Sequence, residues 1–281
     1  MRTLRFLGGR PLAVAGLVFI VTLGLVALLA PALAPHDPLE MNVAQRLRPP
    51  TATNWLGTDE FGRDILSRIL YGARISFSVG FVSAAIGLLL GVPMGLLAGY
   101  YRGAVDRLFM ALTDILFAFP AILLSVALVA MMGSTLENVM IALGVIVTPT
   151  FARVVRAAVL VISSTTYVEA AVAMGVRHGG VMLRHVLPNA MGPILVQVFL
   201  TFSYGVLVEA SLSFLGLGNQ PPTPSWGLML NSAYGYMERA PWFSIFPGAA
   251  IAATVVTFNF VGDGLRDAFD PVLRRSGWGG A

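Results

Sequence analysis

The chain has 281 residues, of which 57% are hydrophobic and only 11% are charged, and its net charge is +4. Soluble domains carry about 25% charged residues, so this composition excludes an ordinary soluble domain. The chain has no cysteine, which excludes disulfides, thiolate nucleophiles and cysteine-based metal sites. All 18 basic residues are arginine, which excludes the lysine-dependent phosphate-binding loop of nucleotide hydrolases. The arginines are spread rather than clustered, which argues against a nucleic-acid partner.

A membrane-spanning helix needs about 20 predominantly apolar residues, and six stretches of the chain meet this requirement. They cover residues 12–34, 76–100, 110–133, 138–160, 191–214 and 243–263. We therefore predict an all-α integral membrane protein with six transmembrane helices and no separate soluble domain. The first stretch ends in a sequence that resembles a signal-peptidase site, but it is longer than the 7–15 residues of a signal-peptide core. A retained first span is the expectation.

The arginines predict the orientation of the six spans. With the N-terminus inside, twelve arginines lie on the cytoplasmic side and six lie outside, and positive residues favour the cytoplasmic side. Both termini are therefore expected in the cytoplasm. We divide the chain into residues 1–74, with the first span and a periplasmic loop, and residues 75–281, a core of five spans. The core contains a cytoplasmic loop at 161–190 and a periplasmic loop at 216–242.

The periplasmic loop before the second span carries a helical pattern. Its apolar side is formed by Phe61, Ile65, Ile69 and Leu70. Its polar side is formed by Arg63, Asp64, Ser67 and Arg68. Thr58 suits the capping position of such a helix. The pattern predicts a short amphipathic helix that lies on the outer surface of the membrane. In the second periplasmic loop, Trp226 and other aromatic residues are expected to anchor the chain at the lipid headgroups.

The second span contains glycines at every fourth position. They are Gly87, Gly91, Gly95 and Gly99. Small residues at this spacing leave a groove along one helix face, and close backbone approach is a main way of packing helices in lipid. We therefore expect another helix, from this chain or from another subunit, to lie tightly against this face.

Between the fourth and fifth spans lies a segment that carries a glutamate, two arginines and two histidines. Thr166 and Glu169 have the spacing of a capping box, which predicts the start of a helix. The helix is expected to cover residues 167–174, with Gly175 just past its end. Its small central residues suit insertion into a groove on a partner. An ordinary connecting loop is the alternative interpretation.

A second short helix is expected to begin near Gly180 and to stop by Leu187, because Pro188 disfavours helix in the residue before it. His178 and His185 are not expected to bind metal, since neither cysteines nor nearby carboxylates accompany them. An interface or a position near the lipid headgroups suits both histidines better.

The fifth span carries one acid, Glu209, late in its sequence. Carboxylates inside a membrane are costly and are candidates for function by default. Two interpretations stay open, namely that Glu209 lines the path of a transported solute and that it pairs with an arginine at the membrane interface. Asp114, near the cytoplasmic end of the third span, is expected to be structural.

The cytoplasmic segment reads EAAVAMGVRHGGVMLRHVLP. This pattern of E-A-A, three residues, G, nine residues, a variable pair and L-P resembles the cytoplasmic loop of permease subunits of ATP-binding-cassette importers. Three further stretches resemble the dipeptide/oligopeptide branch of these importers, and specifically its shorter second permease subunit. They are LGTDEFGRDILSRILYGARIS, EASLSFLGLGNQPPTPSWGLML and VGDGLRDAFDP. The resemblance covers nearly the whole chain from about residue 55 and also fits the first span.

The resemblance implies a type I importer permease fold in the cytoplasmic (inner) membrane of a bacterium or archaeon. It implies as partners a second homologous permease, two cytoplasmic ATP-binding subunits, a periplasmic or lipid-anchored substrate-binding protein, and the lipid bilayer. ATP and magnesium would be bound by the ATPase subunits, so this chain is expected to hold no cofactor and no metal and to be no enzyme itself. The residues expected to couple the chain to the ATPase are Thr166, Glu169, Ala170, Ala171, Gly175, His185 and Pro188. The residues expected along the substrate path are Glu209, Ser213 and Trp226.

Two alternatives to a peptide importer follow from the same sequence. Within the resembled family, a permease for nickel or another metal chelate is the nearest alternative. A self-contained secondary transporter is a different class, and such proteins place ionisable groups near the middle of the membrane. In this chain almost every ionisable group lies at the end of a span, which disfavours that class.

Overall fold

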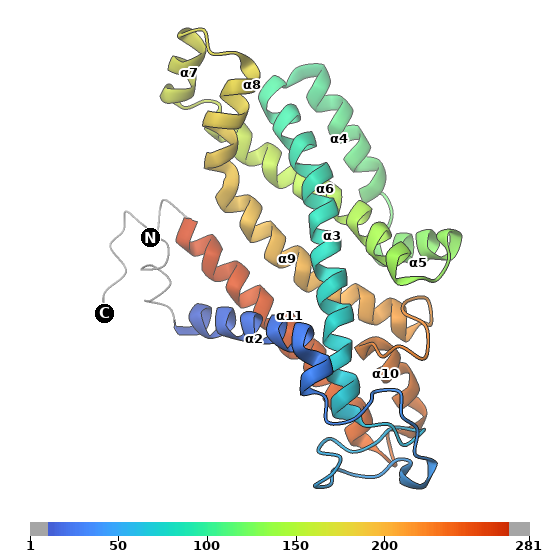
Figure 1. Cartoon of the computed structure of the whole chain (residues 1–281). Coiled ribbons are helices and arrows are strands. Elements are labelled where there is room, and N and C mark those ends of the chain that lie inside the picture. Colours follow the sequence, from blue (N-terminus) through green and yellow to red (C-terminus); the bar gives the residue numbers. More distant parts are fainter. Residues whose placement is uncertain (1–10, 270–281) are drawn as a thin grey trace.

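The computed structural model describes residues 11–269, and within this range the chain is helical with connecting loops and no β-strand (Figure 1). The long helices are α2 (Pro11–Leu33), α3 (Ile65–Tyr101), α4 (Gly103–Phe117), α5 (Ala121–Met132), α6 (Leu136–Ile162), α9 (Leu187–Phe214) and α11 (Pro241–Phe269). The short helices are α7 (Thr166–Ala173), α8 (His178–Val181) and α10 (Trp226–Ala233), with a π-helical turn at Met182–Val186 and 3-10 turns at Val43–Gln45 and Tyr234–Tyr236. The all-α prediction is confirmed.

Five helices of the described range are long and apolar enough to cross a membrane, and a bent pair makes a sixth crossing if it is counted as one span. The bent pair is α4 and α5, which meet at an angle of 85°. The span predicted over residues 110–133 is therefore broken into two helices. The break lies at residues 118–120, because Pro120 lacks an amide N–H and disfavours helix in the residue before it.

Helix α3 runs through the centre of the bundle and packs mainly against α6, α9 and α2 (Figure 1). Its glycine row faces α6 of the same chain. A Cβ atom added at Gly91 would lie 2.6 Å from the Thr148 carbonyl oxygen, and one at Gly87 would lie 2.7 Å from a Val147 methyl group. The absence of side chains on this face of α3 therefore lets the two backbones approach closely.

The short amphipathic helix predicted on the outer membrane surface is wrong. Helix α3 begins at Ile65 and continues without interruption past residue 74, so the division proposed at 74 falls inside a helix. Its N-cap is Asp64, whose carboxylate accepts the Ser67 amide N–H at 2.8 Å. The supposed polar face is buried, and the side chain of Arg68 is only 3% exposed. At about 1.5 Å per residue, the 37 residues of α3 span roughly 55 Å. This length is well beyond the ~30 Å of hydrocarbon in a bilayer.

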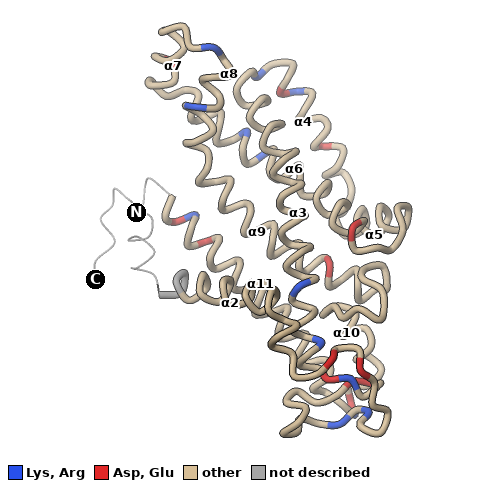
Figure 2. The backbone as a smooth tube through the Cα atoms, in the orientation of Figure 1, with Lys and Arg blue, Asp and Glu red and all other residues tan. Residues whose placement is uncertain are grey.

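Burial of this polar face is possible because the arginines meet a buried carboxylate. The Asp59 carboxylate lies 2.6 Å from Arg63 Nε and 3.4 Å from Arg68 Nε, and its own side chain is fully buried. Paired charges cost far less to bury than isolated ones. Figure 2 shows charged residues gathered at this end of the bundle, near α10, while most of α3 and α9 is uncharged. We call it the α10 end, and the opposite end the α7 end.

Candidate functional site

The α7 end carries the segment singled out by its sequence, residues 163–186, which we call the α7–α8 segment. Helix α7 begins at Thr166, and the residue that flanks it is Thr165. The Thr165 hydroxyl donates to the Ile162 carbonyl at 2.6 Å, and no side chain caps the first turn. The predicted capping box is therefore wrong, because the helix starts one residue too early for Thr166 to cap it. Glu169 lies in the first turn, where a negative charge complements the helix dipole.

The end of α7 agrees with the prediction. Gly175 has φ +82°, a left-handed conformation that glycine adopts without steric penalty. The Gly175 N–H donates to the Val172 carbonyl at 2.9 Å, and the Val176 N–H donates to the Ala171 carbonyl at 3.2 Å. These two bonds form a Schellman motif, which ends the helix sharply.

The predicted stop at Leu187 is wrong. Residues 178–214 form one extended helical run, in which the π-helical turn Met182–Val186 joins α8 to α9. The Leu187 N–H donates to the Met182 carbonyl, five residues back, so the helix widens just before Pro188. Pro188 is the second residue of α9 and follows directly after this widened turn. The widened turn lets the chain pass through the proline without a break.

Helix α7 has an inner and an outer face. Val168 and Ala171 are each 2% exposed and point into the protein. Glu169 and Ala170 are exposed on the outer face, and Met174 at its end is 78% exposed. Ala171 was also expected to contact a partner, and in this structure it is covered by the chain itself.

The other predicted coupling residues lie at the surface of the same segment and just after it. Thr166, Gly175 and Pro188 are exposed, and His185 is half-buried. The inner face of the segment belongs to an apolar cluster with the ends of three long helices. Its members from the segment are Val168, Val181, Met182 and Val186, and they share the cluster with Leu96, Val155, Val159 and Ile194. The segment is therefore a packed element that presents a small, exposed helix.

The residues expected along a substrate path lie at the α10 end and are buried. Glu209 is 0% exposed, and one of its carboxylate oxygens accepts the Ser213 hydroxyl at 2.6 Å. The Ser213 hydroxyl in turn accepts the Asn219 backbone N–H at 3.2 Å. The second Glu209 oxygen has no hydrogen-bond partner within the described range. No described arginine pairs with Glu209, so the alternative of an interfacial ion pair receives no support.

Trp226 is buried, which contradicts the expectation that it anchors the loop at the lipid headgroups. Its side chain is 1% exposed, and its indole N–H donates to the Ile69 carbonyl at 3.0 Å. A Cβ atom at Gly72 would lie 2.7 Å from the Trp226 ring, so the glycine makes room for the indole. Trp226 therefore fastens the start of α10 to α3.

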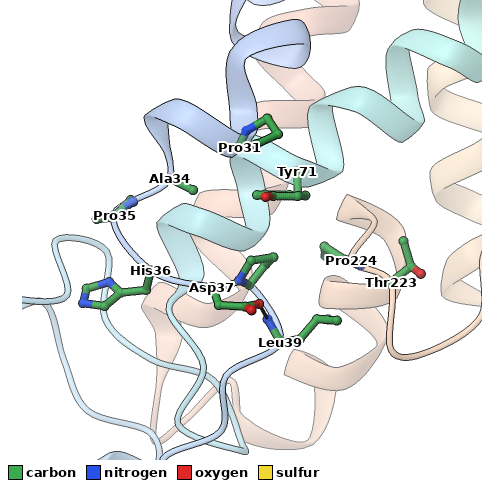
Figure 3. A pocket seen from close by; sticks show the side chains of 10 residues that line it. Pro31, Ala34, Pro35, His36, Asp37, Leu39, Tyr71, Thr223 and Pro224 are labelled. Carbon is green, nitrogen blue, oxygen red and sulfur yellow. Dashed lines mark hydrogen bonds between the residues drawn. The ribbon is translucent and has the colours of Figure 1, made fainter.

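Two cavities were not predicted from the sequence. One of about 590 Å³ lies at the α10 end and is shown in Figure 3. Its walls come from three segments that are far apart in the chain: the end of α2 with the following residues, Tyr71 on α3, and Thr223 with Pro224. The other, of about 550 Å³, lies between α6, α9 and α11, where its polar lining residues are Gln197 and Arg266. Neither leaves a local signal in the sequence, because each is created by packing of distant segments.

Two family models match the chain. Residues 91–275 match the model described as binding-protein-dependent transport system inner membrane component. This chain belongs to that family. Residues 2–50 match the N-terminal TM domain of oligopeptide transport permease C. The resemblance to importer permeases of the dipeptide/oligopeptide branch is thereby confirmed, and the permease is a multi-pass protein of the bacterial inner membrane.

Curated relatives match the permease over almost its whole length. It is 44% identical to the dipeptide transport system permease protein DppC of Alkalihalophilus pseudofirmus, over 94% of this chain and 86% of that relative. It is 47% identical to the glutathione transport system permease protein GsiD of Pectobacterium atrosepticum, over 93% of this chain and 87% of that relative. It is 45% identical to the di/tripeptide transport system permease protein DppC of Pseudomonas aeruginosa, over 94% and 89% of the two chains.

The fold of the permease is similar to that of a solved importer. A chain of the MetNI methionine ABC transporter, in inward facing conformations, superimposes with a TM-score of 0.62 at 23% identity. The match covers 73% of this permease and 98% of that chain. The predicted type I importer permease fold is confirmed.

Proposed function

We propose that this permease forms, with a second homologous permease, the membrane path of an ATP-driven importer for dipeptides and oligopeptides. A substrate-binding protein would deliver the peptide at the α10 end, and two ATP-binding subunits would dock at the α7 end. Both termini would then lie in the cytoplasm. The peptide cargo is supported by the names of the relatives, which include dipeptide, di/tripeptide and glutathione permeases. ATP is hydrolysed by the partner subunits, and this chain contributes no catalytic residue.

The observation that carries the proposal is the exposed outer face of α7. Glu169 and Ala170 present a short, small-sided helix to the exterior, while Val168 on its inner face belongs to the apolar cluster that includes the ends of α3, α6 and α9. A partner that binds this helix can therefore move the long helices with it. Thr166 is the first residue of α7 and Gly175 follows its end, and His185 and Pro188 lie where the segment joins α9. A partner can change the conformation of the permease only if it binds one conformation more tightly than the other.

For the substrate path, Glu209 and Ser213 are proposed for a state in which α9 and α10 separate. In this structure both are covered, and Trp226 holds α10 against α3. The unpartnered Glu209 oxygen is the group that a cationic part of a peptide would meet.

The proposal is tested with the complete complex in liposomes, by measuring ATP hydrolysis and peptide uptake in the presence of the binding protein. The double variant Glu169→Ala/Gly175→Leu removes the charge at the start of α7 and places a leucine at a left-handed residue, which costs about 1–2 kcal/mol. We expect peptide-stimulated hydrolysis and uptake to vanish while the isolated ATPase subunits still hydrolyse ATP. Glu137→Ala is the matched control, since Glu137 is also exposed in the first turn of a helix but lies on α6.

Normal uptake by the double variant would refute the role of α7. Uptake by this chain without any ATPase would refute the proposal of an ATP-driven importer. It would favour the alternative of a self-contained secondary transporter. Uptake of a nickel chelate but of no peptide would keep the importer and change its cargo.

A further inference from the structure

One polar contact joins the α7–α8 segment to the end of α3. The Tyr100 hydroxyl and the His178 Nδ1 atom lie 2.9 Å apart, at hydrogen-bond distance. The His178 ring packs against two tyrosines, with ring centroids 5.7 Å from Tyr100 and 6.1 Å from Tyr101. The two tyrosine rings meet edge to face at 5.3 Å. Tyr101 is the last residue of α3, and His178 is the first of α8, which lies beside this end of α3 in Figure 1.

This contact differs in kind from the others that hold the segment. The rest of the inner face is apolar, through residues such as Val168 and Val181. Apolar contacts have no preferred direction, so they fix the position of the segment less sharply than a directional bond does. A hydrogen bond weakens steeply when its atoms move out of line. Within residues 11–269, the bond between Tyr100 and His178 is the only side-chain hydrogen bond that joins this segment to α3. The other three side-chain bonds of the segment reach the adjoining ends of α6 and α9 and span four residues or fewer along the chain.

Helix α3 is suited to carry a displacement away from this contact. It is one helix of 37 residues that ends at Tyr101 and begins at the other end of the bundle. At that other end, Asp64 caps the first turn of α3. Asp64 lies next to the buried ion pair of Asp59 and Arg68. Along its middle the glycine row fixes α3 against α6. A shift of α8 at His178 therefore acts on one end of a helix whose other end lies at this buried ion pair.

We infer that His178 and Tyr100 are positioning residues that link movement of the α7–α8 segment to α3. The inference rests on the proposed function, because it requires that an ATPase acts on this segment. The histidine accepts the tyrosine hydroxyl, or donates to it, at Nδ1, and the aromatic rings of Tyr100 and Tyr101 keep the imidazole in place. Through this pair, a displacement of the α7–α8 segment is transmitted to the end of α3.

The test compares variants of the complete complex in liposomes, with uptake of a dipeptide and ATP hydrolysis measured in the same sample. Tyr100→Phe removes only the hydroxyl, and His178→Ala removes its partner. Tyr101→Phe is the matched control, since the Tyr101 hydroxyl makes no hydrogen bond with a residue of the described range. His178→Asn is the rescue variant, because its side-chain amide can accept or donate at about the position of Nδ1.

We expect Tyr100→Phe and His178→Ala to raise the number of ATP molecules hydrolysed per peptide by about two- to tenfold, the range that corresponds to one net hydrogen bond. Tyr101→Phe and His178→Asn should keep the wild-type ratio. An unchanged ratio in Tyr100→Phe would overturn the inference. An equal fall of both rates, with the ratio unchanged, would also overturn it, since that is the effect of a purely structural contact.

These outcomes are separate from failure of the proposed function. If the wild-type complex shows no ATP-dependent uptake of any peptide, the function is wrong and the ratio is not defined. If wild type transports and the Tyr100 variant is equally well coupled, the function stands and the link between α8 and α3 is wrong.

Discussion

The close packing of α3 on α6 makes a quantitative prediction at Gly91. A methyl group there would lie 2.5 Å from the Phe151 Cβ atom and 2.6 Å from the Thr148 carbonyl oxygen. Both distances are far shorter than a van der Waals contact, and the oxygen belongs to a helix backbone that cannot rotate away. Gly91→Ala therefore forces α3 and α6 apart over their shared face.

The magnitude is the difference between two terms. Overpacking a tight site costs about 1–3 kcal/mol, and alanine regains about 0.5–1 kcal/mol in a helix interior relative to glycine. The net loss expected for Gly91→Ala is about 1–2 kcal/mol. Gly179→Ala is the matched control, because no atom lies within 4 Å of the position of its Cβ. This control should keep or slightly raise the stability.

The assay is a thermal melt of the purified protein, followed by tryptophan fluorescence. On the scale of soluble proteins of 150–250 residues, 1 kcal/mol moves the melting temperature by about 2–4 °C. We expect Gly91→Ala to melt about 5 °C below Gly179→Ala. If the two variants melt together at the wild-type temperature, then α3 and α6 do not approach as closely as described, and the reasoning from the glycine row fails.

Three further predictions concern charged groups. Asp59→Asn leaves the guanidinium of Arg68, whose side chain is 3% exposed, without its carboxylate at 3.4 Å, while Arg63 keeps its pair with Glu60. Stranding a buried charge costs about 3–5 kcal/mol, so we expect little folded protein by size-exclusion chromatography. Burial, followed by the charge of Asp59, raises the pKa of Glu60 above its ordinary 4.5. A raised pKa in the folded state means that the stability due to Glu60 is complete below 4.5 and is lost as the pH rises through the folded value. Glu60→Gln should therefore raise the melting temperature at pH 7, with a gain that shrinks towards pH 4.5. Asp106→Asn breaks the two-bond pair with Arg156, at 2.5 and 2.6 Å, that ties α4 to α6. Both side chains are partly exposed, so a loss of about 0.5–1 kcal/mol is expected in the same melt.

Each of these has an outcome that contradicts it. Normal yield of Asp59→Asn would show that the arginines do not depend on this carboxylate. A gain for Glu60→Gln that grows as the pH falls would reverse the sign of the linkage. Asp114→Asn is the control for Asp106→Asn, since its pair with Arg153 is largely exposed, with side chains 65% and 47% accessible. A larger loss at Asp114 than at Asp106 would contradict the role given to burial.

Local features of the sequence determined much of this protein. The long apolar runs predicted a membrane protein made only of helices, because a chain in lipid must satisfy its backbone groups within each segment. Gly175 predicted the end of α7, since a left-handed residue after a helix is a property of a few neighbouring residues. The pattern of the cytoplasmic segment predicted the family.

Only the tertiary structure decided which residues are buried and where helices continue. Arg63 and Arg68 looked like a solvated face, because the spacing of charges does not show that Asp59 will neutralise them inside the protein. Trp226 looked like a headgroup anchor, because its acceptor, the carbonyl of Ile69, is 157 residues away in the chain. Periodicity reports which side of a helix is apolar, whereas burial of a polar group depends on partners that folding brings from distant parts of the sequence.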